Sequence, residues 1–330
     1  MRVGVVGVGL AGSSHLLDLV AGRGFTVSAV CARRIDRAKR AADLFGVPLA
    51  FDDAAAMIAE VELDAVVVAT PPAATTEIAE LALGRGLLVL LDKPAGPSAL
   101  ALDQVVRAAG ASATKAVVGY NRRYQVQVHR LREVIEHGAL GLLEAIECRW
   151  TGPYVRRYTA ESTYRRGVEW GDGVLLDTGC HIIDTLFFLG IRPLVVTRAN
   201  LALGTTGTDV AVDADLHCSL LDLPVRVRID DRDGDEACDV TVRGRDGELR
   251  LIRTGLSGTI AGRQIELPAQ DLRRPVDDLP ALAAGDQTYG ASLSEAVAVL
   301  ALIDAIRVRA ARRRWSRPRA KALGRLNGSC

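Results

Sequence analysis

One lysine, one aspartate and one histidine stand out in this 330-residue chain because of where they lie. The chain has only four lysines, and Lys93 is the one placed between an aspartate and a proline, directly after an apolar run. Asp177 and His181 are four residues apart, so both can face one side of a helix that begins near Gly179. Histidine is the usual proton-transfer group near neutral pH, and an ammonium can stabilise negative charge on a substrate oxygen. The pattern predicts acid–base chemistry, with a structural Asp/His pair and a lysine at a strand end as the alternative.

A glycine-rich turn near the start of the chain has the pattern G-x-G-x-x-G. It follows the strand-like run 3–6 and opens a predicted helix, which is the context of a dinucleotide-binding turn. The first glycine allows a tight turn, the second lets a pyrophosphate approach the backbone, and the third allows close packing of helix on strand. The free N–H groups of the helix start would hold the anion. The residues expected to contact the cofactor here are Gly7, Gly9, Leu10, Ala11 and Gly12.

The choice of cofactor depends on the residue that ends the second strand, about 20 residues further on. Ala32 stands where an Asp or Glu would bind the ribose 2′-hydroxyl of NAD, and Arg33 and Arg34 follow it. Because a guanidinium suits a 2′-phosphate, the sequence favours NADP over NAD. The alternative is that both arginines are surface residues of an arginine-rich chain and that NAD is held by backbone groups.

The helices and strands that must position these residues follow two different patterns of apolar residues, one in each half of the chain. Continuous apolar strands are buried on both faces, and in residues 1–120 they alternate with amphipathic helices, which predicts a doubly wound parallel α/β sheet. Ligands of such sheets bind beyond the carboxyl ends of the strands, so Lys93 is expected near the nicotinamide. The expected strands are 3–6, 26–31, 48–51, 65–69, 87–91 and 115–119, and the expected helices are 13–21, 35–45, 53–60, 75–83 and 98–109.

Residues 121–330 are expected to form a second, α+β domain with a mostly antiparallel sheet. Several of its predicted strands alternate apolar and polar residues, so one face of the sheet is solvated or lies at an interface. The expected strands are 143–150, 194–203, 210–221, 225–230, 237–243, 248–253 and 259–267, and the expected helices are 125–137, 179–189 and 292–309.

Composition argues against several classes of function. The chain has 41 Lys+Arg against 40 Asp+Glu, which does not supply the basic field that nucleic-acid binding needs. No apolar run is long enough to span a membrane, and the N-terminus lacks the apolar core of a signal peptide. The six cysteines are scattered without C-x-x-C, which predicts reduced thiols and a cytoplasmic protein. No ligand spacing predicts a metal site.

In five stretches the chain resembles the glucose–fructose oxidoreductase / inositol dehydrogenase (Gfo/Idh/MocA) family. In order and spacing they cover most of residues 1–190, and Asp92 stands where the family usually has a longer Glu. The stretches are Gly7–Gly12, Ala69-Thr70-Pro71-Pro72, Asp92-Lys93-Pro94, Gly119-Tyr120-Asn121-Arg122-Arg123-Tyr124 and Gly173–His181.

The resemblance implies a Rossmann domain and a C-terminal domain whose open sheet forms a homodimer or homotetramer. It implies hydride transfer between a nicotinamide and a carbon that bears a sugar or cyclitol hydroxyl. Lys93, Asp177 and His181 match the family's catalytic residues by position. The positions that line the family's cofactor or active site are Thr70, Pro71, Asp92, Lys93 and Asn121.

Substrate contacts are expected from aromatic and basic residues near the start of the second domain. Aromatic faces suit sugar C–H surfaces and arginines suit a carboxylate or phosphate, which admits a nucleotide-activated sugar. The arginine-rich composition resembles that of high-GC actinobacteria, where such enzymes commonly act on C3 of sugars in aminosugar, deoxysugar or antibiotic biosynthesis. By this association we expect a sugar 3-dehydrogenase or 3-ketoreductase. The residues expected to contact substrate are Arg122, Tyr124, Tyr154, Tyr158, Tyr164 and Trp170.

Three other functions on the same fold stay open. The first is an inositol-type cyclitol dehydrogenase, and the second is a glycosidase that uses bound NAD transiently. The third is a non-catalytic dinucleotide-sensing regulator, which would be expected to lack the lysine or the histidine. Both are present here, as Lys93 and His181.

Overall fold

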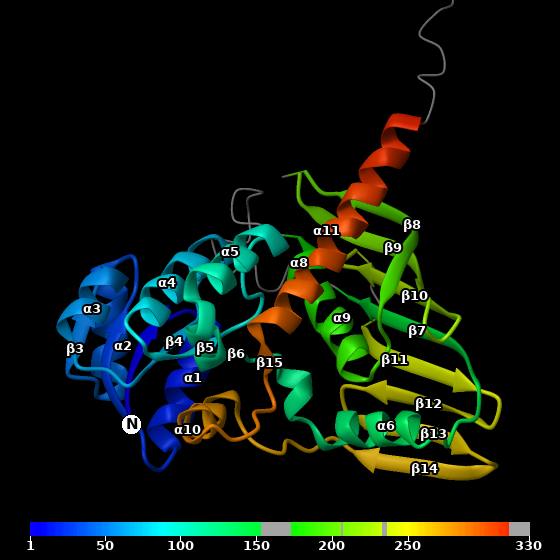
Figure 1. Ribbon diagram of the computed structural model, residues 1–330, viewed down its shortest axis with the longest axis horizontal. Helices are drawn as coiled ribbons and strands as arrows, with labels where there is room; N and C mark the ends of the chain where they lie inside the picture. Colours follow the sequence, from blue (N-terminus) through cyan, green and yellow to red (C-terminus); the bar gives the residue numbers. More distant parts are fainter. Residues whose placement is uncertain (153–172, 206, 233–235, 317–330) are drawn as a thin grey trace, which may run out of the picture.

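Two β-sheets lie next to each other in the computed structural model, and helices pack on both (Figure 1). The structure describes residues 1–152, 173–205, 207–232 and 236–316. The first sheet has seven strands and the second has eight. The predicted fold class, a doubly wound parallel sheet followed by a large, mostly antiparallel sheet, is confirmed.

The first sheet reverses its strand order at β1, with β2 and β3 on one side and β4, β5 and β6 on the other. These six strands pair in parallel. Ligands of such sheets bind at the point of reversal, which here lies beyond the carboxyl ends of β1 and β4. The strands are β1 (Arg2–Val6), β2 (Thr26–Cys31), β3 (Leu49–Phe51), β4 (Ala65–Val68), β5 (Leu88–Leu91) and β6 (Ala116–Val118).

Helices cover both faces of this sheet, which is why its strands are apolar throughout. Val3 and Val5 of β1 pack in one core with Leu16 of α1, whereas Val68 of β4 packs in another with Ile78 of α4. The helices are α1 (Leu10–Ala21), α2 (Ile35–Phe45), α3 (Ala54–Glu60), α4 (Pro72–Gly84) and α5 (Ala99–Ala109).

A late segment of the chain returns to the first sheet, and the sequence did not predict it. β15 (Ala291–Ser292) pairs antiparallel with β6, and α10 (Asp278–Ala284) packs against β5, so that Leu279 joins the core of α1. Pro280 makes this stretch look like a loop, but a proline is tolerated in the first turn of a helix. In Figure 1 both elements, in orange, lie beside the blue and cyan part of the chain.

The second sheet is antiparallel except where β7 and β10 pair in parallel. The single strand expected over 259–267 is wrong: the chain makes a hairpin there, because Ala261 and Gly262 both take positive φ and turn it. The strands are β7 (Leu143–Thr151), β8 (Leu194–Leu203), β9 (Asp209–Cys218), β10 (Leu223–Asp230), β11 (Ala237–Gly244), β12 (Gly247–Ile252), β13 (Gly255–Ile260) and β14 (Arg263–Pro268).

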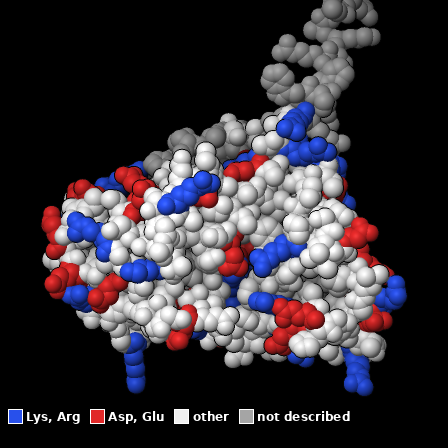
Figure 2. All heavy atoms as spheres, in the orientation of Figure 1, with Lys and Arg blue, Asp and Glu red and all other residues white. Residues whose placement is uncertain are grey.

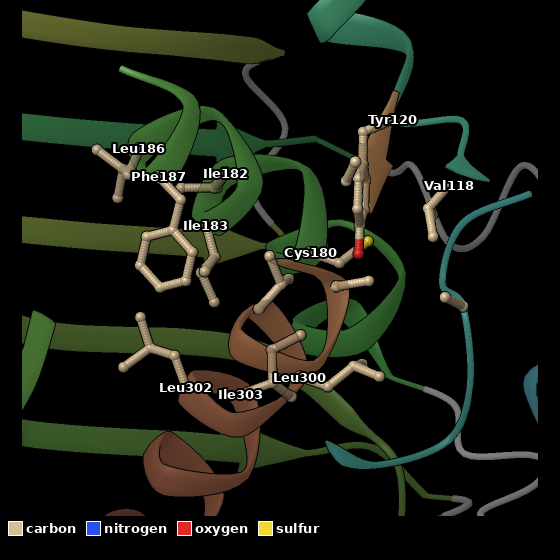
Figure 3. Close-up of a cluster of buried hydrophobic side chains, with 14 of the residues drawn as sticks. Val118, Tyr120, Cys180, Ile182, Ile183, Leu186, Phe187, Leu300, Leu302 and Ile303 are labelled. Carbon is tan, nitrogen blue, oxygen red and sulfur yellow. The ribbon is translucent and has the colours of Figure 1, made fainter. Parts of the chain in front are cut away.

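Helices of the second domain share one hydrophobic core with part of the first domain. α11 (Leu293–Ser316) packs on α5, α9 (Gly179–Phe188) and β8. Figure 3 shows apolar side chains of α9 close to Leu302 and Ile303 of α11, with Tyr120 next to Cys180. This packing fixes α9, the helix that carries His181. The described part of this domain also contains α6 (Val126–Glu136) and the short α8 (Val174–Asp177).

The surface is of mixed charge on the face that Figure 2 shows, where basic and acidic residues alternate between broad uncharged areas. Within the described part of the chain, no helix is long and apolar enough to cross a membrane.

Candidate active site

The glycine turn is built as the sequence pattern requires. Gly7 has φ +97°, and a Cβ there would lie 2.1 Å from the carbonyl oxygen of Ala69. A Cβ at Gly12 would lie 1.8 Å from the Gly7 oxygen. At Gly9, by contrast, a Cβ would have no described atom within 4 Å. Gly7 and Gly12 are therefore required by packing, whereas Gly9 leaves room in front of the turn.

That room lies at the N-terminus of α1. Gly9 is the N-cap residue and no described side chain caps this end, so the first N–H groups of the helix are left for another partner. Leu10 is 68% exposed. A helix N-terminus attracts an anion through these N–H groups and its dipole. The residues present therefore fit the pyrophosphate of a dinucleotide, which Gly9, Leu10, Ala11 and Gly12 would hold.

Directly after β2, where the sequence predicts the adenosine ribose, the chain has two arginines and no carboxylate. Ala32 follows the strand, and its N–H donates to Phe51 O at 3.1 Å. Arg33 is exposed. Arg34 donates from Nε and Nη2 to the two carboxylate oxygens of Asp36, at 3.1 and 2.9 Å. Arg34 is thus oriented by an acidic neighbour that the sequence prediction did not include.

Other predicted cofactor residues lie at the same edge of the sheet. Gly7 packs against Ala69 and Thr70, and the Thr70 hydroxyl lies 3.0 Å from that of Thr75. Pro71 is the N-cap residue of α4. Asn121 is exposed and begins a short 3-10 helix, η2 (Asn121–Tyr124), beyond the end of β6.

Lys93 and Asp177 form an ion pair between the two domains. Lys93 follows the end of β5, and its Nζ donates to Asp177 Oδ1 at 2.9 Å and to the Asp177 carbonyl oxygen at 3.1 Å. Both side chains are about 14% exposed. Two hydrogen bonds to the same residue hold the Lys93 ammonium in one position. The Lys93–Pro94 peptide bond is cis.

Asp209 positions Asp177 indirectly, because it fixes the start of α8. Its Oδ2 accepts a hydrogen bond from Leu175 N at 2.7 Å, and Asp209 is 6% exposed. Gly173 has φ +137°, and a Cβ there would lie 2.1 Å from Asp209 Oδ1. Burial raises the pKa of Asp209, and the bond from the Leu175 N–H opposes that shift. Nothing in the sequence distinguishes this aspartate, at a strand start, from others.

His181 lies in the first turn of α9 and is 6% exposed. Its ring stacks on Trp150, with centroids 5.6 Å apart at 29°, and meets the edge of Tyr120 at 6.4 Å. Burial, then the positive charges of Lys93 and Arg122, hold its pKa well below 6.5, and Asp177 opposes them. The imidazole is therefore neutral at neutral pH and ready to accept a proton.

Arg122 lies over Trp150, the ring that stacks on His181. Its guanidinium is centred 5.0 Å from the Trp150 ring, and Nη2 lies 2.6 Å from Cys238 Sγ on β11. The ring systems at 120, 150 and 181 come from three separate elements, so sequence patterns alone did not reveal that they meet.

His15 contacts the residue that precedes Lys93. Its Nε2 lies 3.3 Å from Asp92 Oδ1, and the His15 side chain is 7% exposed. The pair links α1 to the end of β5.

Of the other residues predicted to contact substrate, one is buried within the fold and four lie outside the described residues. Tyr124 is buried, and its hydroxyl donates to Asp278 Oδ2 of α10 at 2.6 Å, so that group is used within the fold and gives no support to a substrate contact. Tyr154, Tyr158, Tyr164 and Trp170 lie outside the described residues. Within those that are described, no group of three or more His, Cys, Asp or Glu could hold a metal ion.

Two family models match the chain. Residues 1–120 match the model described as "Oxidoreductase family, NAD-binding Rossmann fold", and residues 128–250 match the "GFO/IDH/MocA C-terminal domain".

Relatives of known name agree with these models. The rhizopine catabolism protein MocA of Rhizobium meliloti is 28% identical over 322 residues, which is 92% of this chain and 93% of that protein. Inositol 2-dehydrogenase 4 of Saccharopolyspora erythraea is 33% identical over 45% of this chain and 44% of its own length. A putative UDP-kanosamine synthase oxidoreductase subunit of Amycolatopsis mediterranei is 32% identical over 63% and 56%. The chain thus spans about half the length of these last two relatives.

Solved structures share the fold over nearly the whole chain. A 3-ketoreductase of Actinomadura kijaniata, crystallised with NADP and TDP-benzene, has a TM-score of 0.83 at 22% identity and covers 94% of this chain and 97% of its own. The WlbA dehydrogenase of Bordetella pertussis, crystallised with NADH and UDP-GlcNAcA, has a TM-score of 0.79 at 21% identity, with coverages of 94% and 96%. With both domain models matched in order on a chain of this fold, the protein belongs to the Gfo/Idh/MocA family.

Proposed function

We propose that the protein is a nicotinamide-dependent oxidoreductase that interconverts a hydroxyl and a keto group on a sugar or cyclitol. The observation that supports this most is the Lys93–Asp177 ion pair, with the buried, neutral His181 beside it, at the sheet edge that carries the glycine turn. The pair joins the domain that fits a dinucleotide to the domain that would hold the substrate. Membership of the family supports the same reaction.

The roles of the three residues follow from their surroundings. In the oxidising direction His181 accepts the proton of the substrate hydroxyl, because its lowered pKa leaves the ring neutral at neutral pH, with a nitrogen lone pair free to take the proton. Lys93 donates a hydrogen bond to the same oxygen and stabilises the negative charge that develops there. Asp177 holds the Lys93 side chain in place. When bound, the nicotinamide accepts or supplies the hydride.

NADP(H) is the proposed cofactor. Ala32 offers no carboxylate to repel a 2′-phosphate, and Arg33 and Arg34 follow it. Arg34 is already paired with Asp36, but its side chain is 67% exposed, and ion pairs at the surface are weak. A phosphate can therefore compete with Asp36 for this guanidinium.

The proposed substrate is an activated sugar that reacts at C3. Support comes from the relative named as an oxidoreductase subunit of a putative UDP-kanosamine synthase, and from neighbours of the same fold crystallised with TDP-benzene or UDP-GlcNAcA. A cyclitol is the second candidate, because another relative is named inositol 2-dehydrogenase. We further propose a homodimer or homotetramer through the second sheet, and a reducing compartment such as the cytoplasm, since the described cysteines are all free thiols.

The test follows the near-ultraviolet absorbance of the reduced nicotinamide with a panel of sugars, cyclitols and their keto forms, in both directions and with both cofactors. We expect turnover of at least one pair, and its loss in Lys93→Ala. Tight cofactor retention with cleavage of a glycoside and no net redox change would identify a glycosidase instead. Cofactor binding without any turnover across the panel would favour a regulator.

A further inference from the structure

Arg122 is a buried cation without an anionic partner in the described part of the chain. It is 8% exposed, and its Nη1 is fully buried with no described hydrogen-bond partner. Its contacts are the Cys238 thiol at 2.6 Å and the face of Trp150 at 5.0 Å. A thiol is a weak acceptor and an aromatic face compensates only part of a buried charge.

The next residue shows how this chain treats a buried arginine whose role is structural. Arg123 is 4% exposed, and its guanidinium meets two carboxylates, Asp184 at 2.8 Å and Glu295 at 3.2 Å. A buried charge is costly unless it is paired and hydrogen-bonded. The fold therefore compensates Arg123 fully, whereas Arg122 is left able to bind an anion from outside.

Arg122 is also close to the reaction centre. Trp150, which its guanidinium overlies, stacks on His181, and Trp150 pairs with Cys238 across β7 and β11. Arg122 follows Asn121 at the carboxyl edge of the first sheet, the edge from which Lys93 reaches Asp177. An anion bound at Arg122 would thus be part of the substrate, the molecule whose reacting oxygen would lie at His181 and Lys93.

We propose that Arg122 binds an anionic group of the substrate, a phosphoryl or carboxylate oxygen, so that the enzyme acts on acidic rather than neutral sugars. This rests on the proposed function and names its substrate class. The guanidinium presents Nη1 and Nη2 as a planar fork that matches two oxygens of such a group, and the incoming oxyanion displaces the Cys238 thiol.

Anion binding also has a consequence for His181. The positive charge of Arg122 is one of the causes that lower the His181 pKa. An acidic substrate offsets that charge and moves the pKa back toward its ordinary value. The imidazole then holds the substrate proton more readily once the acidic group is in place.

The test is a binding titration that does not depend on turnover. The enzyme with reduced cofactor bound is titrated with UDP-glucose, glucuronate or glucose, and tryptophan fluorescence reports binding. We expect one acidic ligand to bind at least about tenfold more tightly than glucose, as one charge-assisted contact implies. Preference for UDP-glucose identifies a phosphoryl group, and preference for glucuronate identifies a carboxylate.

Variants assign the preference to Arg122. Arg122→Gln should bind the acidic ligand no better than glucose. Arg122→Lys keeps a positive charge and should keep part of the preference. This second variant provides the test if the Gln variant does not fold. Arg107→Gln makes the same change at an arginine 79% exposed on α5 and should bind as the wild type does. Circular dichroism and cofactor affinity report folding.

Two results would overturn the proposal: equal affinity of the wild type for all three ligands, or an acidic preference that survives in the Arg122 variants. Failure of the proposed function would give a different result: acidic ligands would bind through Arg122, but no sugar would change the nicotinamide absorbance. Turnover of neutral sugars without acidic preference would instead leave the oxidoreductase in place and remove the anion site.

Discussion

His15 Nε2 lies 3.3 Å from Asp92 Oδ1, and this contact joins the helix that begins at the glycine turn to the residue before Lys93. The position of the glycine turn and the position of Lys93 are therefore linked. We predict that His15→Leu lowers kcat about tenfold, since small displacements of a reacting group are costly, while KM for the sugar changes little. Steady-state kinetics check this.

His15→Gln, which keeps a polar group able to reach Asp92, should restore part of kcat. His137→Leu, at the exposed end of α6, is the matched control and should behave as the wild type. If the loss of kcat is as large in His15→Gln as in His15→Leu, the contact has no positioning role and His15 acts only through packing.

Lys93 and His181 carry the second prediction. Each of Lys93→Ala and His181→Ala should lower kcat by about 10²-fold or more, because proton transfer and stabilisation of the substrate oxygen are lost. Affinity for the reduced cofactor, measured by nicotinamide fluorescence, should survive because the glycine turn is unaltered. Lys39→Ala, at an exposed lysine of α2, is the control. Near-normal turnover in both variants would refute the assignment.

The pH profile of oxidation gives a third prediction. His181 must be neutral to accept a proton, and its pKa lies well below 6.5. Activity should therefore persist as pH falls through 6.5 and be lost only when pH passes the lowered pKa. Arg122→Gln removes one of the cations that lower this pKa, so the acid limb of kcat/KM should move to higher pH. A wild-type acid limb above 6.5 would contradict the neutral, buried histidine.

The local features of the fold could be predicted from sequence because they depend on neighbouring residues. The G-x-G-x-x-G turn follows from steric limits at Gly7 and Gly12, and the buried strands of the first sheet follow from continuous apolar runs. The hairpin at Ala261 and Gly262 was missed because its turn lacks the Asn-Gly or Asp-Gly signal.

Contacts between distant segments could not be read in the same way. Lys93 and Asp177 are 84 residues apart, and their meeting depends on how the two sheets pack. The stack of Arg122, Trp150 and His181 depends on the position of α9 above β7, which is set by the core around α11. A pattern along the chain carries no signal for such packing.

Cofactor preference gives the fourth prediction. Arg33→Ala and Arg34→Ala should each lower the ratio of kcat/KM for NADPH over NADH about tenfold, because each removes a charge-assisted contact to the 2′-phosphate. Ala32→Asp should lower it further by adding a carboxylate that repels phosphate and suits a 2′-hydroxyl. Arg107→Ala is the control. A wild-type preference for NADH would remove the basis of this prediction.

Arg123 and Asp184 give the last prediction, which concerns stability. Arg123 Nη2 lies 2.8 Å from Asp184 Oδ1, and the Asp184 side chain is fully buried. Arg123→Met leaves that carboxylate without its counter-charge and should cost about 3–5 kcal/mol in the free energy of unfolding, measured with urea. Arg132→Met, at an arginine 42% exposed and paired with Glu136, should cost no more than about 1 kcal/mol.

The effect should also depend on pH. Burial raises the pKa of Asp184 to about 6 even though Arg123 opposes it, so the variant without Arg123 has a still higher pKa. An acid whose folded pKa lies above its unfolded value costs stability as pH rises through that range. The Arg123→Met defect should therefore be small in acid, where Asp184 is protonated, and full at alkaline pH. A defect of equal size at both ends would mean that lost packing, and not the uncompensated carboxylate, destabilises the variant.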